Sequence, residues 1–174
     1  MQRFINNPDD LVDETVAGFV KAHRHLVRLH PENPRVVLSV DAATPGRVGI
    51  VTGGGSGHLP VFTGYVGPGL ADAAAIGNVF SAPPPDPILA ATRAVDAGAG
   101  VLYIYGNFSG DVMNFDMAAE LAAAEGIAVR SIVTTDDVAS SPAESRAARR
   151  GVAGNVFVFK VAGAAAERRL PLDA

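Results

Sequence analysis

The stretch IVTGGGSGHLP, residues 50–60, places four glycines, a serine and a histidine directly after a short apolar run. The β-branched pair Ile50–Val51 predicts a strand, and the glycines after it allow a sharp turn and a close approach of a ligand to the backbone. Free amides at the start of a following helix, with Ser56 as its N-cap, could hold an oxyanion, a hydroxyl or a phosphate. We therefore expect a ligand-binding loop at residues 52–58.

Three known motifs fail in this loop at the same position. A Walker loop requires a lysine after Gly57, where His58 stands. A dinucleotide fingerprint and a nucleophile elbow both require a glycine at that position. A serine hydrolase that uses Ser56 is a remote alternative, because no histidine follows the acidic residues in the Ser–acid–His order. The interpretation that we favour is that His58 contacts a ligand; the alternative is an incidental histidine in a tight turn.

Short apolar runs alternate with alanine-rich helical patterns along the chain. The predicted strands are residues 36–40, 48–51, 101–105, 128–134 and 156–159. The predicted helices are residues 7–27, 59–66, 87–97, 114–125 and 143–150. This alternation predicts an α/β fold, a layered and largely parallel sheet with helices on both faces, in a single domain over residues 1–174. Ligands of such sheets bind beyond the carboxyl ends of the strands, where the loops 52–58 and 106–111 are expected.

The second of these loops lies in YIYGNFSGDVMNF, residues 103–115. A carboxylate such as Asp111, in a glycine-flanked loop after a strand, can accept a proton from a substrate hydroxyl, as phosphoryl transfer requires. The alternative is that Asp111 caps the following helix. Two further loops have mainly structural interpretations: the rigid FSAPPPDP at 80–87, a possible wall of the site, and the Asp136–Asp137 pair, for which a metal site is conceivable.

Composition excludes several classes of function. A hydrophobic fraction of 48% and a charged fraction of 18% are typical of a globular protein. The net charge of −4 and the absence of a basic tract argue against nucleic acid as a partner. The chain has no cysteine, and its histidines are spaced too irregularly for a metal site. Because no signal-peptide or membrane-span pattern is visible, we expect a cytoplasmic protein.

Six stretches together resemble the substrate-binding subunit of dihydroxyacetone kinase. They are FINNPDDLVDETVAGFVKAH, GGGSGHLPVFTGYVGPGL, NFSGDVMNF, DDVA, RRGVAG and KVAGAAAER, and they follow one another over nearly the whole chain. The resemblance covers only the first half of that subunit. The second half, with a histidine that captures the carbonyl of the substrate as a hemiaminal, is absent from this sequence, so we expect the chain alone to be incomplete for catalysis.

The resemblance implies a phosphotransferase that acts on a small ketose such as dihydroxyacetone, in glycerol metabolism. His58 would bond to the substrate hydroxyl, and Asp111 would assist its deprotonation. The implied substrate-binding residues are Gly54, Gly55, Ser56, Gly57, His58, Gly106 and Asp111.

The resemblance also implies partners. This chain would bind no cofactor itself, because the family carries ATP-Mg, or a tightly held ADP recharged by a phosphorelay, on a separate nucleotide-binding subunit or domain. Related subunits form homodimers. An alternative function is a non-catalytic ketose-binding or regulatory module, or a truncated remnant of the kinase.

Three positions depart from the family pattern. Leu59, Ala82 and Gly106 stand where family members usually carry glutamate, serine and lysine. The departures predict a pocket of different polarity, suited to a larger keto-sugar such as a tetrulose.

Overall fold

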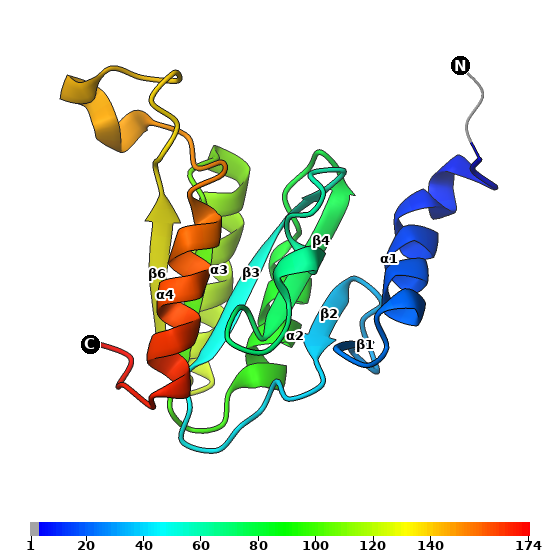
Figure 1. Ribbon diagram of the computed structural model, residues 1–174, viewed down its shortest axis with the longest axis horizontal. Coiled ribbons are helices and arrows are strands. Elements are labelled where there is room, and N and C mark those ends of the chain that lie inside the picture. Colours follow the sequence, from blue (N-terminus) through cyan, green and yellow to red (C-terminus); the bar gives the residue numbers. More distant parts are fainter. Residues whose placement is uncertain (1–3) are drawn as a thin grey trace.

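The computed structural model describes residues 4–174, which form a six-stranded sheet (Figure 1). Residues 1–3, the start of the N-terminal stretch without a signal-peptide pattern, lie outside the described residues. The strands follow the order β1-β2-β4-β3-β5-β6. Their bounds are β1 Val27–Leu29, β2 Val36–Ser39, β3 Gly49–Ser56, β4 Ala73–Val79, β5 Val101–Gly106 and β6 Val129–Thr134. Strands β3 to β6 are parallel, whereas β1 and β2 pair antiparallel at one edge, which confirms the expected largely parallel α/β sheet.

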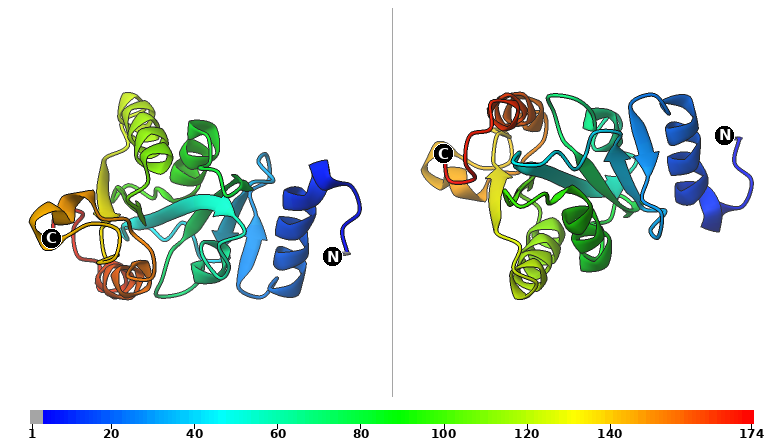
Figure 2. Two further views of the ribbon diagram at one scale, coloured as in Figure 1. Left: turned by 90° about the horizontal axis from the view of Figure 1, so that it is seen from above. Right: turned by 90° about the horizontal axis from the view of Figure 1, so that it is seen from below.

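Helices cover both faces of this sheet. They are η1 Pro8–Asp10, α1 Leu11–Ala22, η2 Thr63–Tyr65, α2 Pro85–Val95, α3 Ser109–Ala124, η3 Ala143–Ala148 and α4 Asn155–Glu167. Seen from above, α2 and α3 lie on one side of the sheet and α4 on the other (Figure 2). None of the helices in residues 4–174 combines the length and the apolar character needed to cross a membrane.

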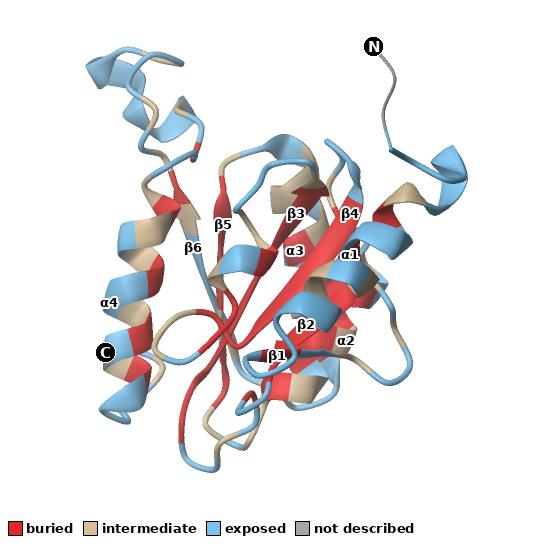
Figure 3. Cartoon of the chain, turned by 45° about the vertical axis from the view of Figure 1, so that its right-hand side comes forward, coloured by how far each residue is buried: buried red, intermediate tan, exposed pale blue. Residues whose placement is uncertain are grey.

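Strand side chains alternate between two cores, as the pleat of a strand requires. In β3, Val51 packs toward α2 and α3, whereas Ile50 packs toward α4. In β5, Tyr103 and Ile104 divide in the same way. The strands are consequently buried along most of their length (Figure 3). Burial on both faces is typical of parallel sheets and explains their near-continuous apolar runs.

Two predicted elements are wrong in type. Residues 156–159, predicted as a strand, lie in α4, and residues 59–66, predicted as a helix, form a loop with the short η2 turn. The run VFVF has high β propensity, but the buried residues of α4 recur at helical spacing through Asn155, Phe159, Gly163 and Ala166. Tertiary packing therefore overrides local propensity in this segment.

Other boundaries also differ from the predictions. Strand β4 was missed because its sequence AAAIGNV is rich in alanine and glycine, which are depleted in strands. The first helix ends at Ala22, short of residue 27, and residues 143–150 contain a 3₁₀ helix where an α-helix was predicted. The glycine run 53–55 is not a turn. It belongs to β3 and pairs with β4, so the turn begins only after Ser56 and no helix follows for Ser56 to cap.

A buried ion pair connects the amino-terminal ends of β3 and β4. Nη2 of Arg47 donates to Oδ1 of Asp72 at 2.6 Å, and Oδ2 of Asp72 accepts the backbone N–H of Ile50 at 2.8 Å. The two side chains are only 8% and 4% exposed. Burial raises the pKa of Asp72, and the hydrogen bond from Arg47 opposes this rise. The carboxylate thus depends on its arginine for compensation inside the protein.

We expect Arg47→Ala to lower the free energy of unfolding by about 3–5 kcal/mol, because it leaves a buried carboxylate uncompensated. Urea denaturation at neutral pH measures this loss. Arg130→Ala is the matched control: it removes a surface pair in which Arg130 and Asp173 are 55% and 70% exposed, and it should cost less than about 1 kcal/mol. Equal losses in the two variants would contradict the structural role of the buried pair.

Candidate functional site

A cavity of about 1350 Å³ lies at the carboxyl ends of the parallel strands. Four segments line it: residues 57–62 after β3, 80–82 after β4, 106–114 around the end of β5, and 148–156 between β6 and α4. This is the position where parallel α/β sheets bind ligands. The loops at 52–58 and 106–111 were expected there, and the segment 80–87 was considered as a wall of the site. The connection between β6 and α4 joins them.

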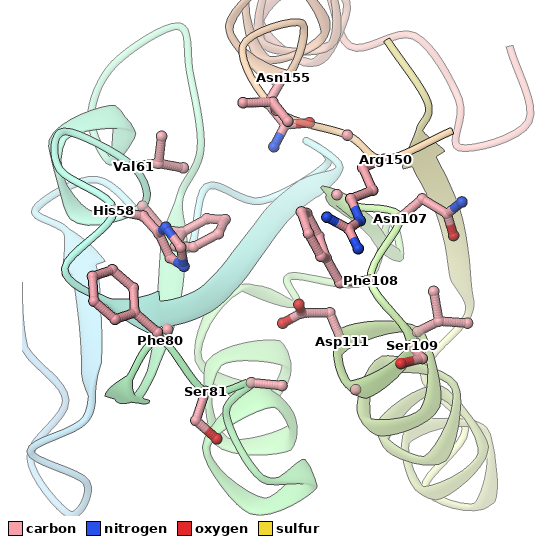
Figure 4. A pocket seen from close by; sticks show the side chains of 18 of the residues that line it. His58, Val61, Phe80, Ser81, Asn107, Phe108, Ser109, Asp111, Arg150 and Asn155 are labelled. Carbon is pink, nitrogen blue, oxygen red and sulfur yellow. The ribbon is translucent and has the colours of Figure 1, made fainter. Parts of the chain in front are cut away.

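His58 stands on one wall of the cavity, between two phenylalanines. Its ring lies 5.0 Å from the ring of Phe80 at an interplanar angle of 65°, and 6.5 Å from the ring of Phe62 at 85°. Both are edge-to-face contacts, which orient the imidazole without using its nitrogens. Gly57, with φ +104°, makes the turn that carries His58 out of β3. The imidazole is exposed and lines the cavity (Figure 4).

Glycines allow the walls to approach one another. A Cβ at Gly55 would lie 2.5 Å from the backbone nitrogen of Ser81, so the loop after β4 can cross the end of β3 only over a glycine. The N–H of Phe80 donates to the carbonyl of Ser56 at 2.9 Å and holds this crossing. A Cβ at Gly106 would lie 2.6 Å from the carbonyl oxygen of Gly151, which brings the end of β5 against the loop before α4.

Asp111 stands on a different wall, in the first turn of α3. In Figure 4 its carboxylate points into the cavity, which His58 lines from the opposite side. Its Oδ1 is buried and has no hydrogen-bond partner within the described part of the chain. Burial raises the pKa of Asp111 from 3.8 to about 6, opposed by a hydrogen bond to its own backbone. A carboxylate with such a pKa can accept a proton near neutral pH.

The structure brings together five of the seven residues that the resemblance implies for substrate binding. Gly55, Gly57, His58, Gly106 and Asp111 all line the cavity. The other two, Gly54 and Ser56, are absent from its lining.

Gly54 and Ser56 are occupied elsewhere. Gly54 lies against the ring of Phe62, and Oγ of Ser56 donates to the carbonyl of Gly77 at 2.9 Å. The hydroxyl of Ser56 therefore faces strand β4, which argues against the serine-hydrolase alternative.

The structure also bears on the two alternative roles considered for aspartates, helix capping by Asp111 and metal binding by the Asp136–Asp137 pair. Phe108 occupies the N-cap position of α3, so Asp111 does not cap that helix. Asp136 accepts the backbone N–H groups of Val152 and Gly154, each at 2.9 Å, and so organises the loop before α4. Within residues 4–174 no group of three or more acidic or histidine side chains could hold a metal ion.

Several lining residues were not singled out from the sequence. They are Phe62, Phe108, Arg150 and Asn155. Arg150 belongs to the RRGVAG stretch, which contributed to the family resemblance without a role for its arginines. The three positions that depart from the family pattern, Leu59, Ala82 and Gly106, all line the cavity, as do Phe80 and Ser81 from the proline-rich segment.

Comparison with known proteins defines the family. Residues 17–174 match the Dak1 domain, and the chain belongs to this family. It is 49% identical over its whole length to the dihydroxyacetone-binding subunit DhaK of PTS-dependent dihydroxyacetone kinase 2 from Listeria innocua, of which it covers 52%. It is 43% identical over 99% of its length to L-erythrulose 1-kinase from Mycolicibacterium smegmatis, of which it covers 30%. The resemblance inferred from the motifs is confirmed.

Solved structures share the fold. The dihydroxyacetone kinase of C. freundii in its native form superposes with a TM-score of 0.90 at 36% identity, over 99% of this chain and 32% of that one. The dihydroxyacetone kinase operon co-activator DhaQ superposes with a TM-score of 0.82 at 35% identity, over 92% of this chain and 49% of that one. The chain spans about half the length of the DhaK relatives that it matches.

We expect Asp111→Asn to raise the free energy of unfolding at about pH 7.5 by on the order of 1–2 kcal/mol. The wild-type carboxylate is ionised there although burial raises its pKa to about 6, and the amide removes that cost. The folded state binds the proton more tightly than the unfolded state, so wild-type stability falls as the pH rises from about 3.8 to about 6. The gain should therefore shrink toward pH 4.

Urea denaturation at several pH values measures this gain. Glu120→Gln, an exposed position on the same helix, is the control and should change stability by less than about 0.5 kcal/mol. If the free energy of unfolding of Asp111→Asn at neutral pH is equal to or lower than that of the wild type, the ionised carboxylate of Asp111 does not destabilise the fold, and the prediction is wrong.

Proposed function

We propose that this chain is the substrate-binding component of a small-ketose kinase. It binds a ketose such as dihydroxyacetone and positions one hydroxyl for phosphoryl transfer. One observation carries the proposal: His58 and Asp111, which come from separate loops, line the same cavity at the carboxyl end of the sheet. Membership in the Dak1 domain family and relatives named as dihydroxyacetone-binding subunits support it.

His58 and Asp111 have different roles toward the substrate hydroxyl. The imidazole of His58 hydrogen-bonds to the substrate hydroxyl and holds it toward Asp111. Asp111 accepts the proton as the hydroxyl oxygen attacks the phosphorus of a phosphoanhydride donor. A new O–P bond forms, the P–O bond to the donor breaks, and its electron pair leaves with the donor. The products are a ketose phosphate, the shortened donor and a protonated Asp111.

The residues that line the cavity bear on which ketose is bound. Leu59 and Ala82 stand where the family usually carries a glutamate and a serine, and both line the cavity. This less polar lining supports a tetrulose as the substrate, and the relatives include proteins named as L-erythrulose and D-erythrulose kinases.

The phosphoryl donor arrives on another polypeptide in this proposal. ATP-Mg, or an ADP recharged by a phosphorelay, is held by a separate nucleotide-binding subunit or domain that docks over the cavity. A related kinase of C. freundii has been crystallised with AMP-PNP and Mg²⁺. The described chain lacks a Walker loop at residues 52–58, which supports this division. We also propose that the chain works as a homodimer in the cytoplasm, in glycerol metabolism.

We expect His58→Ala and Asp111→Ala, made in an enzyme completed with the second half of a DhaK subunit and with its donor subunit, each to lower turnover by at least about tenfold. His58→Ala loses the orientation of the hydroxyl, and Asp111→Ala loses the proton acceptor. Initial rates with dihydroxyacetone and with erythrulose measure the effect. His25→Ala and Asp86→Asn, both exposed and outside the cavity lining, serve as controls with unchanged rates. Wild-type rates in both cavity variants, with intact folding, would overturn the proposal.

We expect kcat/KM to rise with pH through about 6 and then to level off, because Asp111 accepts a proton only when it is ionised and burial raises its pKa to about 6. The rise of kcat/KM with pH should report the ionisation of Asp111, so it should be absent from the residual activity of Asp111→Asn. A profile that is flat between about pH 5 and about pH 8 in the wild type would contradict this role.

A regulatory module is the second candidate, favoured by the similarity to the operon co-activator DhaQ. In that case the cavity would bind a ketose without phosphorylating it. Calorimetry with dihydroxyacetone and erythrulose, followed by an assay with the donor subunit present, separates the two functions. Binding with no ketose phosphate formed would support the regulatory module.

A further inference from the structure

Arg150 occupies a singular position in the cavity. Among the lining residues within the described chain it is the only lysine or arginine, and Asp111 is the only carboxylate. The proposed substrate is a neutral ketose, which gives a guanidinium nothing to neutralise. The product of the proposed reaction, in contrast, carries a phosphoryl group. The positive charge of Arg150 therefore complements the transferred phosphoryl group and not the neutral ketose that accepts it.

The backbone of Arg150 is held on both sides. Its N–H donates to Oγ of Ser140 at 3.0 Å, and its carbonyl accepts the N–H of Asp137 at 2.9 Å. The preceding residue is held as well, because Nδ2 of Asn107 donates to the carbonyl of Arg149 at 2.7 Å. The contact of Asn107 ties this segment to the end of β5, just before the helix that carries Asp111, so the backbone from which the Arg150 side chain projects is fixed before any ligand arrives.

The side chain of Arg150 lies beside the turn that carries Asp111. Its guanidinium carbon is 5.8 Å from the centre of the Phe108 ring, a cation–π contact, and Phe108 is the N-cap residue of α3. Figure 4 shows the guanidinium beside the ring of Phe108, on the side of Asn107, among the residues that line the cavity.

Within the described part of the chain, no carboxylate forms an ion pair with this guanidinium. The ion pairs found within residues 4–174 involve Arg35, Arg47, Arg93 and Arg130, and none involves Arg150. An aromatic face orients a guanidinium and leaves its N–H donors available. Arg150 is thus oriented, charged and open to a ligand.

Other groups on this side of the cavity suit a negative charge. The N-terminal residues of both α3 and α4 line it, and the N-terminus of a helix carries a partial positive charge. The cavity also has room for a phosphoryl group next to a three- or four-carbon ketose. These features support the arginine, which supplies the full charge and the paired donors that fit phosphate oxygens.

We propose that Arg150 binds the phosphoryl group of this site. Its guanidinium holds the equatorial oxygens of the group as it moves from the donor to the ketose hydroxyl, and it holds the phosphate of the product. This inference rests on the proposed ketose-kinase function. Arginines that contact a transferring phosphoryl group act on its transition-state charge, so Arg150 contributes mainly to kcat and to affinity for the phosphorylated product.

Calorimetry of the full chain with two probes, dihydroxyacetone and dihydroxyacetone phosphate, tests the inference. Arg150→Ala should weaken binding of the phosphate by at least about tenfold and change binding of the neutral ketose by less than about twofold. Arg150→Lys keeps the charge but loses the paired donors and should fall between the two. In an enzyme completed with the second half of a DhaK subunit and with its donor subunit, Arg150→Ala should lower kcat with little change in the KM for the ketose, which a merely structural defect would not do.

Arg146→Ala is the matched control, because it removes the same charge from the same connection without touching the lining of the cavity, and it should change neither affinity. Unchanged affinity of Arg150→Ala for dihydroxyacetone phosphate, with ketose binding intact, would overturn the role of Arg150 and leave the proposed function standing. A wild-type chain that binds no ketose at all would overturn the proposed function itself, and the inference with it.

Discussion

Backbone-to-backbone contact at the carboxyl ends of β3 and β5 is the constraint on which the site depends. A Cβ at Gly55 would meet the backbone of Ser81, and a Cβ at Gly106 would meet the carbonyl of Gly151. Both contacts are possible only because glycine has no side chain. They draw the loops after four parallel strands around one cavity. The loops after β3, β5 and β6 contribute an imidazole, a carboxylate and a guanidinium, and the loop after β4 contributes part of the wall. The glycines act here chiefly through close packing, with Gly57 alone needing a positive φ to turn the chain at His58.

Asp72, which is buried, and Asp111, which is half-buried, show how burial of a carboxylate affects both stability and chemistry. Burial raises the pKa of both Asp72 and Asp111. Asp72 is paired with Arg47 and bonded to the backbone of β3, so its charge is compensated and it holds the sheet together. Asp111 has an oxygen without a partner, which leaves that oxygen free for a substrate at a cost to folding. An unsatisfied group of this kind in a cavity is typical of a site that the ligand completes.

The prediction of the fold succeeded where the chemistry of the side chains and the packing agree. Alternating apolar runs placed β2, β3, β5 and β6 and indicated helices on both faces. It failed at β4, which lies between β2 and β3 and is rich in alanine, a residue with low β propensity. It also failed at α4, whose VFVF run has high β propensity. The segment 59–66 was wrong for a related reason. Its apolar side chains pack over Gly54 and β4, so their spacing does not follow a helix.

The sequence by itself determined the family, the α/β class and the identity of His58 and Asp111 as the residues to examine, because these depend on motifs and on residue chemistry that can be recognised locally. Only the tertiary structure decided which residues share the cavity. It turned Ser56 toward Gly77, used Asp136 to organise the loop before α4, and brought Arg150 beside Phe108. These outcomes rest on contacts between segments far apart in the chain, whose geometry depends on how the strands pair and how closely their backbones can approach.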